Sequence, residues 1–494
     1  MTVVQPQQPG PQGSNPPPDL PADLPDDRWP ARLGWRDSAR RILHLAWPVL
    51  IAQLAVVGFA TVDTLLVARY AALDLAALAV GSAAYITVFI GLMGVVLAIG
   101  PIVGQLFGAG RLPEAGRQLH QAVWVALALS VAGSTLLAFP TPFLALSQAS
   151  PEVEAKVRGY LMALAFSLPA ALLFAAYRGF NNAVSRPKAV MVIQVGGLAL
   201  KVPLSVALIH GVPGLSIPEL GVVGCGIATC IAMWSQVLAG LWMLGKDRFY
   251  APYALRGHGL RAPDRKALAA QLRLGVPMGA SILIEITAFS FMAIFIARLG
   301  ATAVAGHQLA INLVSVLFML PLALANATGV LVAQRIGAND VRAARRVGWH
   351  GLQIGTALGA LFGVLVYGLR EPLLRIYTDD PLVIAAALPL LAWVALFHAA
   401  DAAQAIASFV LRAWCIATVP MLLFAVCLWG VGLSGGYVLG FNLTGLTPPA
   451  LQGAPGFWVA ATSGLVLAAL SMSGLLAWVL RQQRSALPAE VNRR

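Results

Sequence analysis

One stretch of the chain occurs twice, as GPIVGQLFGAGRLPEAGR at residues 100–117 and as GVLVAQRIGANDVRAARR at residues 329–346. The copies align without a gap at a spacing of 229 residues, and the alignment extends over residues 48–117 and 277–346. A repeat of this length in an apolar chain predicts a membrane protein with two related lobes. Such proteins commonly open a site between or within the lobes to either side of the membrane in turn. The repeat therefore indicates transport.

The composition is typical of a chain that crosses a membrane many times. Hydrophobic residues make up 59% and charged residues 11% of the 494 residues, whereas soluble proteins contain about 25% charged residues. A spanning helix needs about 20 apolar residues. Twelve charge-poor runs meet this need, at about 42–68, 77–105, 119–141, 157–178, 188–212, 222–245, 273–298, 308–334, 346–369, 383–411, 418–440 and 456–481. We expect an all-α polytopic membrane protein with twelve transmembrane helices in two pseudo-symmetric six-helix bundles.

These runs divide the chain into two lobes and three connecting or terminal segments. We expect a disordered cytoplasmic tail over 1–36, an N-lobe over 37–246, a cytoplasmic loop over 247–272, a C-lobe over 273–482 and a cytoplasmic tail over 483–494. The first tail holds too few apolar residues to pack a core. It lacks the pattern of a cleaved signal peptide, so the first span is expected to remain in place.

Positive charge is unevenly distributed across the predicted topology. With both termini in the cytoplasm, cytoplasmic segments hold 26 of the 33 Lys and Arg residues, outward loops hold 6, and Lys201 lies within a span. This asymmetry follows the positive-inside rule and predicts a multi-pass inner-membrane protein in that orientation. The net charge of +13 is explained by the topology, so no nucleic-acid partner is expected.

The sequence carries no motif of an enzyme or of a nucleotide-driven pump. Walker A, HExxH and nucleophile-elbow patterns are absent. The cysteines have no metal-ligand spacing and are expected to be buried small apolar residues; they are Cys225, Cys230, Cys415 and Cys427. We therefore expect a transporter without a cofactor, driven by an ion gradient and not by catalysis.

Four charged residues lie well inside the predicted spans, namely Asp63, Lys201, Glu285 and Asp401. Each costs about 2.5–3.5 kcal/mol at a helix centre, so each needs a partner, water or a function. A helix rises about 1.5 Å per residue. Counted from the expected cytoplasmic edge at Arg273 and Arg412, Glu285 lies about 18 Å and Asp401 about 16 Å deep. Both therefore reach the midplane, where a coupling-ion site is expected.

Glu285 and Asp401 are for this reason candidate cation-coupling residues. Two like charges in a low dielectric cannot both stay ionised without a cation, so either Na⁺ lies between them or one carboxyl holds a proton. Both arrangements couple transport to a gradient of Na⁺ or H⁺, with Glu285 and Asp401 as metal ligands if the ion is Na⁺. The alternative is that each carboxylate only caps a local polar network.

Asp63 and Lys201 have opposite charges at similar depth in the N-lobe, which suggests a salt bridge. One interpretation is a fixed structural pair. The other is a pair that breaks and forms again as Asp63 takes up a proton, which would make Asp63 a third cation-coupling residue. Both interpretations stay open at this point.

Weaker candidates for tuning the carboxylates or lining a substrate cavity are Lys201, His307, Gln308, Asn312, His398 and Gln53. His307, Gln308 and Asn312 either face the cavity or bond to neighbouring helices. His398 precedes Asp401 by three residues, so both share a helix face.

Several short motifs occur in order along the chain. They include Trp47-Pro48 with Gln53, Val62-Asp63-Thr64, Pro101-Ile102-Val103 with Gln105 and Gly108, Arg178-Gly179-Phe180-Asn181, Gly275-Val276-Pro277 with Glu285, His307-Gln308 with Asn312, and Asp401-Ala402 with Arg412. Together they resemble the multidrug and toxic compound extrusion (MATE) transporters, particularly the NorM-like branch, from about residue 40 to about residue 440.

The resemblance implies two bundles around a V-shaped cavity and export of amphipathic, often cationic drugs in exchange for Na⁺ or H⁺. Asp63 matches the family's N-lobe carboxylate, and Glu285 and Asp401 match its C-lobe cation-binding carboxylates. The expected partners are small-molecule drugs and the lipid bilayer, and we expect a monomer. Two departures are Lys201, near which similar proteins tend to carry asparagines, and Phe397, where they often carry a polar or tyrosine side chain.

Three other functions fit the sequence less well. A flippase for lipid-linked saccharides or precursors would line its cavity with basic residues, and Lys201 is the only one visible. A membrane enzyme with His307 or His398 as general base would need a nucleophile at the same depth. A structural scaffold gives no reason to retain intramembrane charges.

Overall fold

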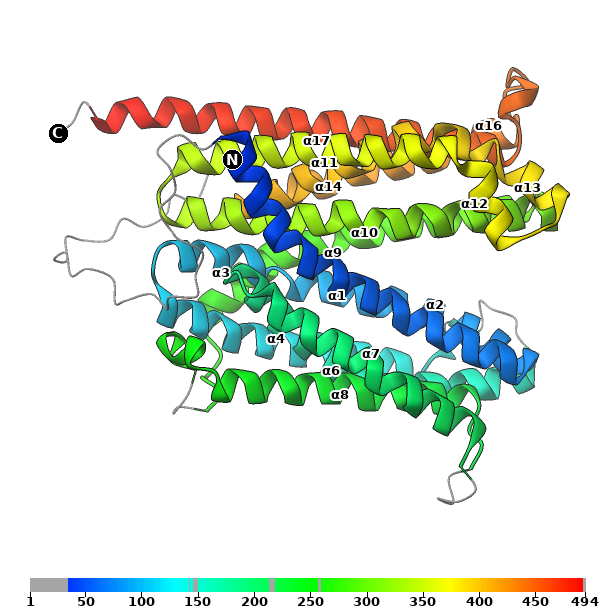
Figure 1. Ribbon diagram of the computed structural model, residues 1–494, viewed down its shortest axis with the longest axis horizontal. Coiled ribbons are helices and arrows are strands. Elements are labelled where there is room, and N and C mark those ends of the chain that lie inside the picture. The colour runs from blue at the N-terminus through cyan, green and yellow to red at the C-terminus, as the bar shows by residue number, and fades with distance from the viewer. Residues whose placement is uncertain (1–33, 142, 145–149, 213–217, 256–258, 492–494) are drawn as a thin grey trace.

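The computed structural model describes residues 34–141, 143–144, 150–212, 218–255 and 259–491. Twelve helical spans are present in this part of the chain, which confirms the twelve predicted spans. Most of them run along the long axis of the molecule (Figure 1). The tail expected to be disordered, residues 1–36, lies almost entirely outside the described residues. At the other end of the chain, the last helix continues to Val491 through most of the predicted tail over 483–494.

The first six spans follow the chain in order. They are α1 (Trp35–Tyr70), α2 (Ala72–Val96) continued by α3 (Ile99–Gly108), α4 (Leu112–Ala138), α6 (Pro151–Ala183), α7 (Pro187–His210) and α8 (Val222–Lys246). A short 3-10 helix, η2 (Arg248–Tyr253), follows α8. Most helices extend beyond the predicted runs because the flanking polar residues continue the helix past its apolar part.

The second six spans repeat the arrangement. They are α9 (Arg265–Ala297), α10 (Ala301–Gly337), α11 (Val341–Gly368), α13 (Pro381–Ala387) continued through η3 (Leu390–Trp393) to α14 (Val394–Ala413), α15 (Thr418–Phe424) continued through the π-helical η4 (Ala425–Ser434) to α16 (Gly435–Gly440), and α17 (Ala454–Val491). The short helices α12 (Arg370–Tyr377) and η5 (Pro449–Leu451) lie between spans.

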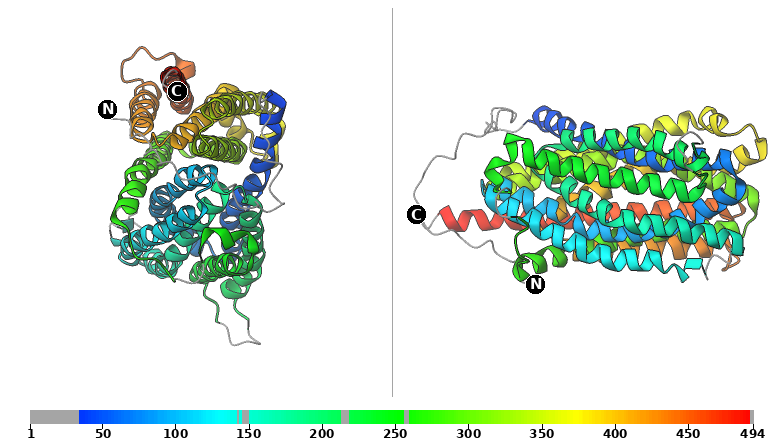
Figure 2. Two further views of the ribbon diagram at one scale, coloured as in Figure 1. Left: turned by 90° about the vertical axis from the view of Figure 1, so that its left-hand side faces the viewer. Right: turned by 90° about the horizontal axis from the view of Figure 1, so that it is seen from below.

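Two large apolar cores correspond to the two bundles. Seen along the helices, the yellow and orange helices of the second half form a group separate from the cyan helices of the first (Figure 2, left). Helix α1 joins both bundles: Ile42, Leu45, Ala46 and Val49 belong to the C-lobe core, and Val67 belongs to the N-lobe core. It packs on both α7 and α10 and crosses the molecule obliquely (Figure 1).

The lobes contact each other in a pseudo-symmetric way. Helix α1 packs on α10, its counterpart α9 packs on α2, and α3 packs on α10. Gly94 and Gly279 lie back to back, since a Cβ added to Gly94 would be 2.6 Å from the Cα of Gly279. Small residues of this kind allow close approach of membrane helices.

These contacts gather toward one side, which we call the basic side: the side where α1 and α9 begin and where α3 and α10 end. There Ser38 Oγ near the start of α1 lies 2.8 Å from His350 Nδ1 near the start of α11. The contacts of α9 with α2 involve Gly275 and Gly279, in the first half of α9. The lobes are therefore joined on the basic side.

The cysteine prediction was right for two positions and wrong for the others. Cys225 and Cys427 are buried, but Cys230 is half-buried and Cys415 is exposed. Cys415 lies in the turn between α14 and α15, with a φ of +58°, so it is outside the packed part of its span.

Candidate carboxylate sites in the two lobes

The structure brings Glu285 on α9 and Asp401 on α14 close enough for their charges to interact. Asp401 is buried, with 6% of its surface exposed, and Glu285 is half-buried. Gln404 lies one turn after Asp401, donates from Nε2 to Asp401 Oδ1 at 3.0 Å and also interacts with the Glu285 carboxylate. An amide thus connects two acids from different helices.

Two further features of this site bear on its charge. Gln404 Oε1 is buried and has no hydrogen-bond partner among the residues that the structure describes. Arg412, near the end of α14, is buried and interacts electrostatically with Glu285, with its guanidinium 4.8 Å from the Phe409 ring centroid. The site therefore holds two carboxylates, one unpaired amide oxygen and one permanent positive charge.

The donor atoms of this site are oxygens. Within the described ranges, no three His, Cys, Asp or Glu side chains form a metal-binding group. Asp401, Glu285 and the free oxygen of Gln404 suit a cation that prefers oxygen ligands, and either carboxyl can instead hold a proton. The chemistry that these oxygens allow is binding of a cation or uptake and release of a proton.

In the N-lobe, Asp63 on α1 and Lys201 on α7 form a buried salt bridge. Lys201 Nζ donates to Asp63 Oδ2 at 2.6 Å and to the Phe59 carbonyl at 3.2 Å, and lies 4.6 Å from the Phe59 ring centroid. Only 1% of Lys201 and 7% of Asp63 is exposed. Asp63 Oδ1 has no hydrogen-bond partner in the described part of the chain. The ammonium is well satisfied, while the carboxylate keeps one free oxygen.

The weaker candidates do not gather at one point. Buried His307 accepts a hydrogen bond at Nδ1 from Trp458 Nε1 at 3.2 Å. Buried His398 has an Nε2 without a described partner, and its ring centroid lies 5.9 Å from that of Phe397. The others are Gln308 and Asn312, exposed on α10, and Gln53, half-buried on α1.

Three residues that interact with the predicted site residues were not themselves predicted from the sequence. Gln404 had a usable signal, since it follows Asp401 by three residues and so lies beside it on the helix. Arg412 served only as a marker of the cytoplasmic edge, and nothing in its local sequence indicates that its side chain is buried and interacts with Glu285. Trp458 is 151 residues from His307, and nothing in the local sequence indicates their contact.

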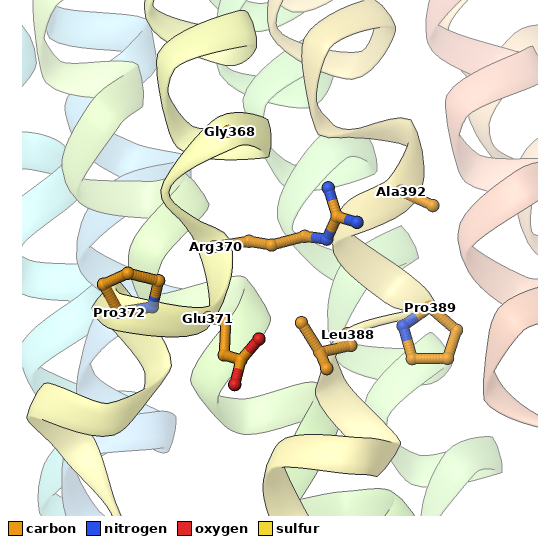
Figure 3. A pocket seen from close by; sticks show the side chains of 7 residues that line it. All are labelled: Gly368, Arg370, Glu371, Pro372, Leu388, Pro389 and Ala392. Atoms are coloured by element: carbon orange, nitrogen blue, oxygen red, sulfur yellow. The ribbon is translucent and has the colours of Figure 1, made fainter.

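A surface hollow of about 460 Å³ lies elsewhere, lined by Gly368, Arg370, Glu371, Pro372, Leu388, Pro389 and Ala392. Figure 3 shows the Arg370 and Glu371 side chains of α12 beside this hollow, opposite Leu388 and Pro389. It shares no residue with either carboxylate site.

Two repeated six-helix bundles, joined on one side and carrying buried carboxylates, define a secondary transporter. The MatE family model matches residues 48–207 and 277–438, two segments at the same spacing as the internal repeat. The chain belongs to the multidrug and toxic compound extrusion (MATE) family.

Relatives and solved structures agree with this assignment. The probable multidrug resistance protein NorM of Aromatoleum aromaticum is 42% identical over 448 residues, covering 90% of this chain and 96% of that protein. The multidrug resistance protein NorM of Vibrio cholerae is 34% identical, covering 91% and 97%. The MATE transporter VcmN of Vibrio cholerae, in its bent form, superposes with a TM-score of 0.79 at 18% identity, covering 91% and 98%.

Proposed function

We propose that this protein exports amphipathic, often cationic drugs across the inner membrane in exchange for Na⁺ or H⁺, with Glu285 and Asp401 as the coupling residues of the C-lobe. The observation that carries the proposal is the pair of carboxylates connected by Gln404. The family match and the NorM relatives favour drug export over the flippase alternative, and no catalytic activity is proposed.

The charge balance of the site supports a single monovalent cation. Two ionised carboxylates close together in a low dielectric repel each other strongly. The Arg412 guanidinium offsets one of the two negative charges, and one Na⁺ or one proton neutralises the other. We infer that the C-lobe takes up one ion for each transport cycle.

The orientation follows from the distribution of Lys and Arg, so we take the basic side to be cytoplasmic and both termini to lie there. The lobes are joined on that side, which describes an outward-facing conformation. In the outer half of α10, Gln308 and Asn312 are exposed one turn apart. Exposed amides inside a span are costly against lipid, so we place them on the wall of the water-filled cavity, together with Gln53 on α1.

The proposed cycle starts with ion entry from outside. Binding at Glu285 and Asp401 favours release of the drug from the outward-open cavity, and the lobes then rock to face the cytoplasm. Apolar walls hold varied drugs mainly by burial of surface, with few directed hydrogen bonds. The protein works as a monomer in the lipid bilayer, without a cofactor or a nucleic-acid partner.

Asp63 has a more constrained role in this proposal. Its carboxylate is already held by Lys201, a cation of the chain itself. Asp63 therefore takes part in coupling only when this bridge opens and a proton or Na⁺ replaces the ammonium. His398 and His307 act in our proposal as neighbours that tune the polarity of the C-lobe interior.

Reconstitution tests the coupling ion and the function together. Purified protein in liposomes should move ethidium against its concentration gradient when an inward Na⁺ gradient or an inward H⁺ gradient is imposed, and a coupled exchanger should respond to at least one of them. Ethidium flux is followed by fluorescence with DNA inside the vesicles, and liposomes without protein are the control. Equal flux with and without both gradients would contradict ion-coupled export.

Gln404→Leu should weaken ion binding without abolishing transport. The change removes the amide that connects the carboxylates but leaves both charges. A hydrogen bond to a charged group contributes about 1.5–3 kcal/mol, so we expect the ion concentration for half-maximal ethidium export to rise about 10-fold to 150-fold. Gln236→Leu, at a buried glutamine of the N-lobe, is the matched control. An unchanged half-maximal concentration in Gln404→Leu would remove Gln404 from the ion site.

A further inference from the structure

Two glutamines reach across from one lobe to the other on the basic side. Gln105 on α3 donates from Nε2 to the carbonyl of Ala413, the last residue of α14, at 2.8 Å. Gln334 on α10 donates from Nε2 to the carbonyl of Ala183, the last residue of α6, at 2.8 Å, and to Ser185 Oγ at 2.8 Å. The two bonds are reciprocal, since Gln105 and Gln334 occupy equivalent positions of the repeat.

The acceptors are suited to these donors. The last carbonyls of a helix lack intrahelical partners and form the negative end of its dipole. Helices α6 and α14 end in the same way: Ser185 and Cys415, two residues after each end, have left-handed φ angles of +61° and +58°. This turn carries the chain away and leaves the carbonyls of Ala183 and Ala413 open to a donor from the opposite lobe.

Glycine makes the approach of the two segments possible. Gly108 follows Gln105 by three residues, and a Cβ added to it would lie 1.8 Å from the carbonyl oxygen of Gln334. Gly337 follows Gln334 by three residues, and a Cβ added there would lie 1.8 Å from the carbonyl oxygen of Gln105. No side chain fits at such a distance, and the atom in the way is backbone and cannot rotate aside.

We propose that Gln105, Gly108, Gln334 and Gly337 form an interlobe clasp that closes the drug pathway on the cytoplasmic side. Both hydrogen bonds join different lobes, so they exist only while that side is shut and are lost when the lobes rock to reload. The four residues are positioning residues for transport, because they set the balance between outward-facing and inward-facing states without contacting ion or drug. The assignment of the side rests on the orientation given under the proposed function.

The clasp predicts which way each substitution moves the lobes. A methyl group in Gly108→Ala or Gly337→Ala prevents closure and should shift the protein almost entirely to the inward-open state. Gln105→Leu and Gln334→Leu remove one bond each and should raise the ratio of inward-open to closed molecules about 2-fold to 10-fold, since a neutral hydrogen bond contributes about 0.5–1.5 kcal/mol. The double glutamine variant should exceed either single one.

Pulsed electron paramagnetic resonance measures this ratio directly. Spin labels are placed at Arg117→Cys and Arg346→Cys, exposed and equivalent positions near the starts of α4 and α11. The native cysteines are first replaced by alanine, because a serine in place of Cys415, whose Sγ lies 3.7 Å from Gln105 Nε2, would add a new acceptor for Gln105. The protein with an unsubstituted clasp should show mainly a short distance between the two spin labels, and the glycine variants should show a longer distance. Gly100→Ala, on α3 where no atom lies within 4 Å of the added methyl, is the matched control and should keep the short distance.

The outcomes separate the clasp from the function. The short distance retained in both glycine variants would overturn the clasp. If the glycine variants do not reach the membrane, the double variant Gln105→Leu/Gln334→Leu provides the test. An unchanged ratio of inward-open to closed molecules in that variant would overturn the clasp. The distances are measured without drug or ion gradient, so this failure would leave ion-coupled export intact. Loss of gradient-driven ethidium flux in the unsubstituted protein would instead reject the proposed function alone.

Discussion

Asp401→Asn is expected to lower ion-driven drug export strongly while leaving the protein at normal abundance in the membrane. The substitution keeps the size of the side chain and an oxygen that can accept from Gln404 Nε2, so the local packing of α14 should survive. It removes the negative charge that attracts the ion. Because coupling free energies are typically 1–3 kcal/mol, its loss should lower gradient-driven ethidium export about 5-fold to 150-fold.

Glu285→Gln should show the same defect. In either variant only one carboxylate remains beside Arg412, and the guanidinium neutralises its charge, so the site no longer needs a cation. Export from cells and drug resistance are measured beside the amount of protein in the membrane. Glu371→Gln, at an exposed acid of α12 that pairs with Arg375, is the control and should transport normally. Full resistance in both Asp401→Asn and Glu285→Gln would reject the assigned coupling residues.

The sequence reveals the carboxylate pair because helix geometry is regular. A constant rise per residue predicts one depth for Glu285 and Asp401, and in the structure their charges are close enough to interact. The same counting took Arg412 as the cytoplasmic edge, where an arginine near a helix end commonly lies, and did not predict that its side chain is buried in the protein. Its burial depends on how α14 packs against other helices, and periodicity within one helix does not contain that information.

Contacts between lobes are hidden from the sequence for a related reason. Gln105 bonds to Ala413, 308 residues away, and the acceptor is a backbone carbonyl that any residue would supply. The repeat shows that Gln105 and Gln334 are equivalent, but not that each reaches the opposite lobe. Likewise, the hydrophobic pattern of α1 predicts a span and says nothing of its first half packing in the C-lobe core.

The salt bridge of the N-lobe leads to the second large effect. Lys201→Met leaves the Asp63 carboxylate buried without its cation, and Asp63→Asn leaves a buried ammonium with only the Phe59 carbonyl and ring. Removing one partner of a buried ion pair costs about 3–5 kcal/mol, so each single variant should melt well below the unsubstituted protein. The melting temperature of purified protein in detergent measures this. Arg375→Met, which breaks the exposed bridge to Glu371, is the control and should change it much less.

The double variant Asp63→Asn/Lys201→Met separates the structural role of the pair from a role in coupling. Replacing a buried ion pair by neutral side chains of similar size is often neutral for stability, so the double variant should recover most of the melting temperature lost in either single one. If Asp63 exchanges Lys201 for an ion, as we propose, ion-driven export should stay well below normal despite this recovery. Recovery of export together with stability would instead make the bridge purely structural and leave coupling to Glu285 and Asp401 alone. In this double variant the melting temperature measures the contribution of the ion pair to stability, and ion-driven export measures the contribution of Asp63 to coupling.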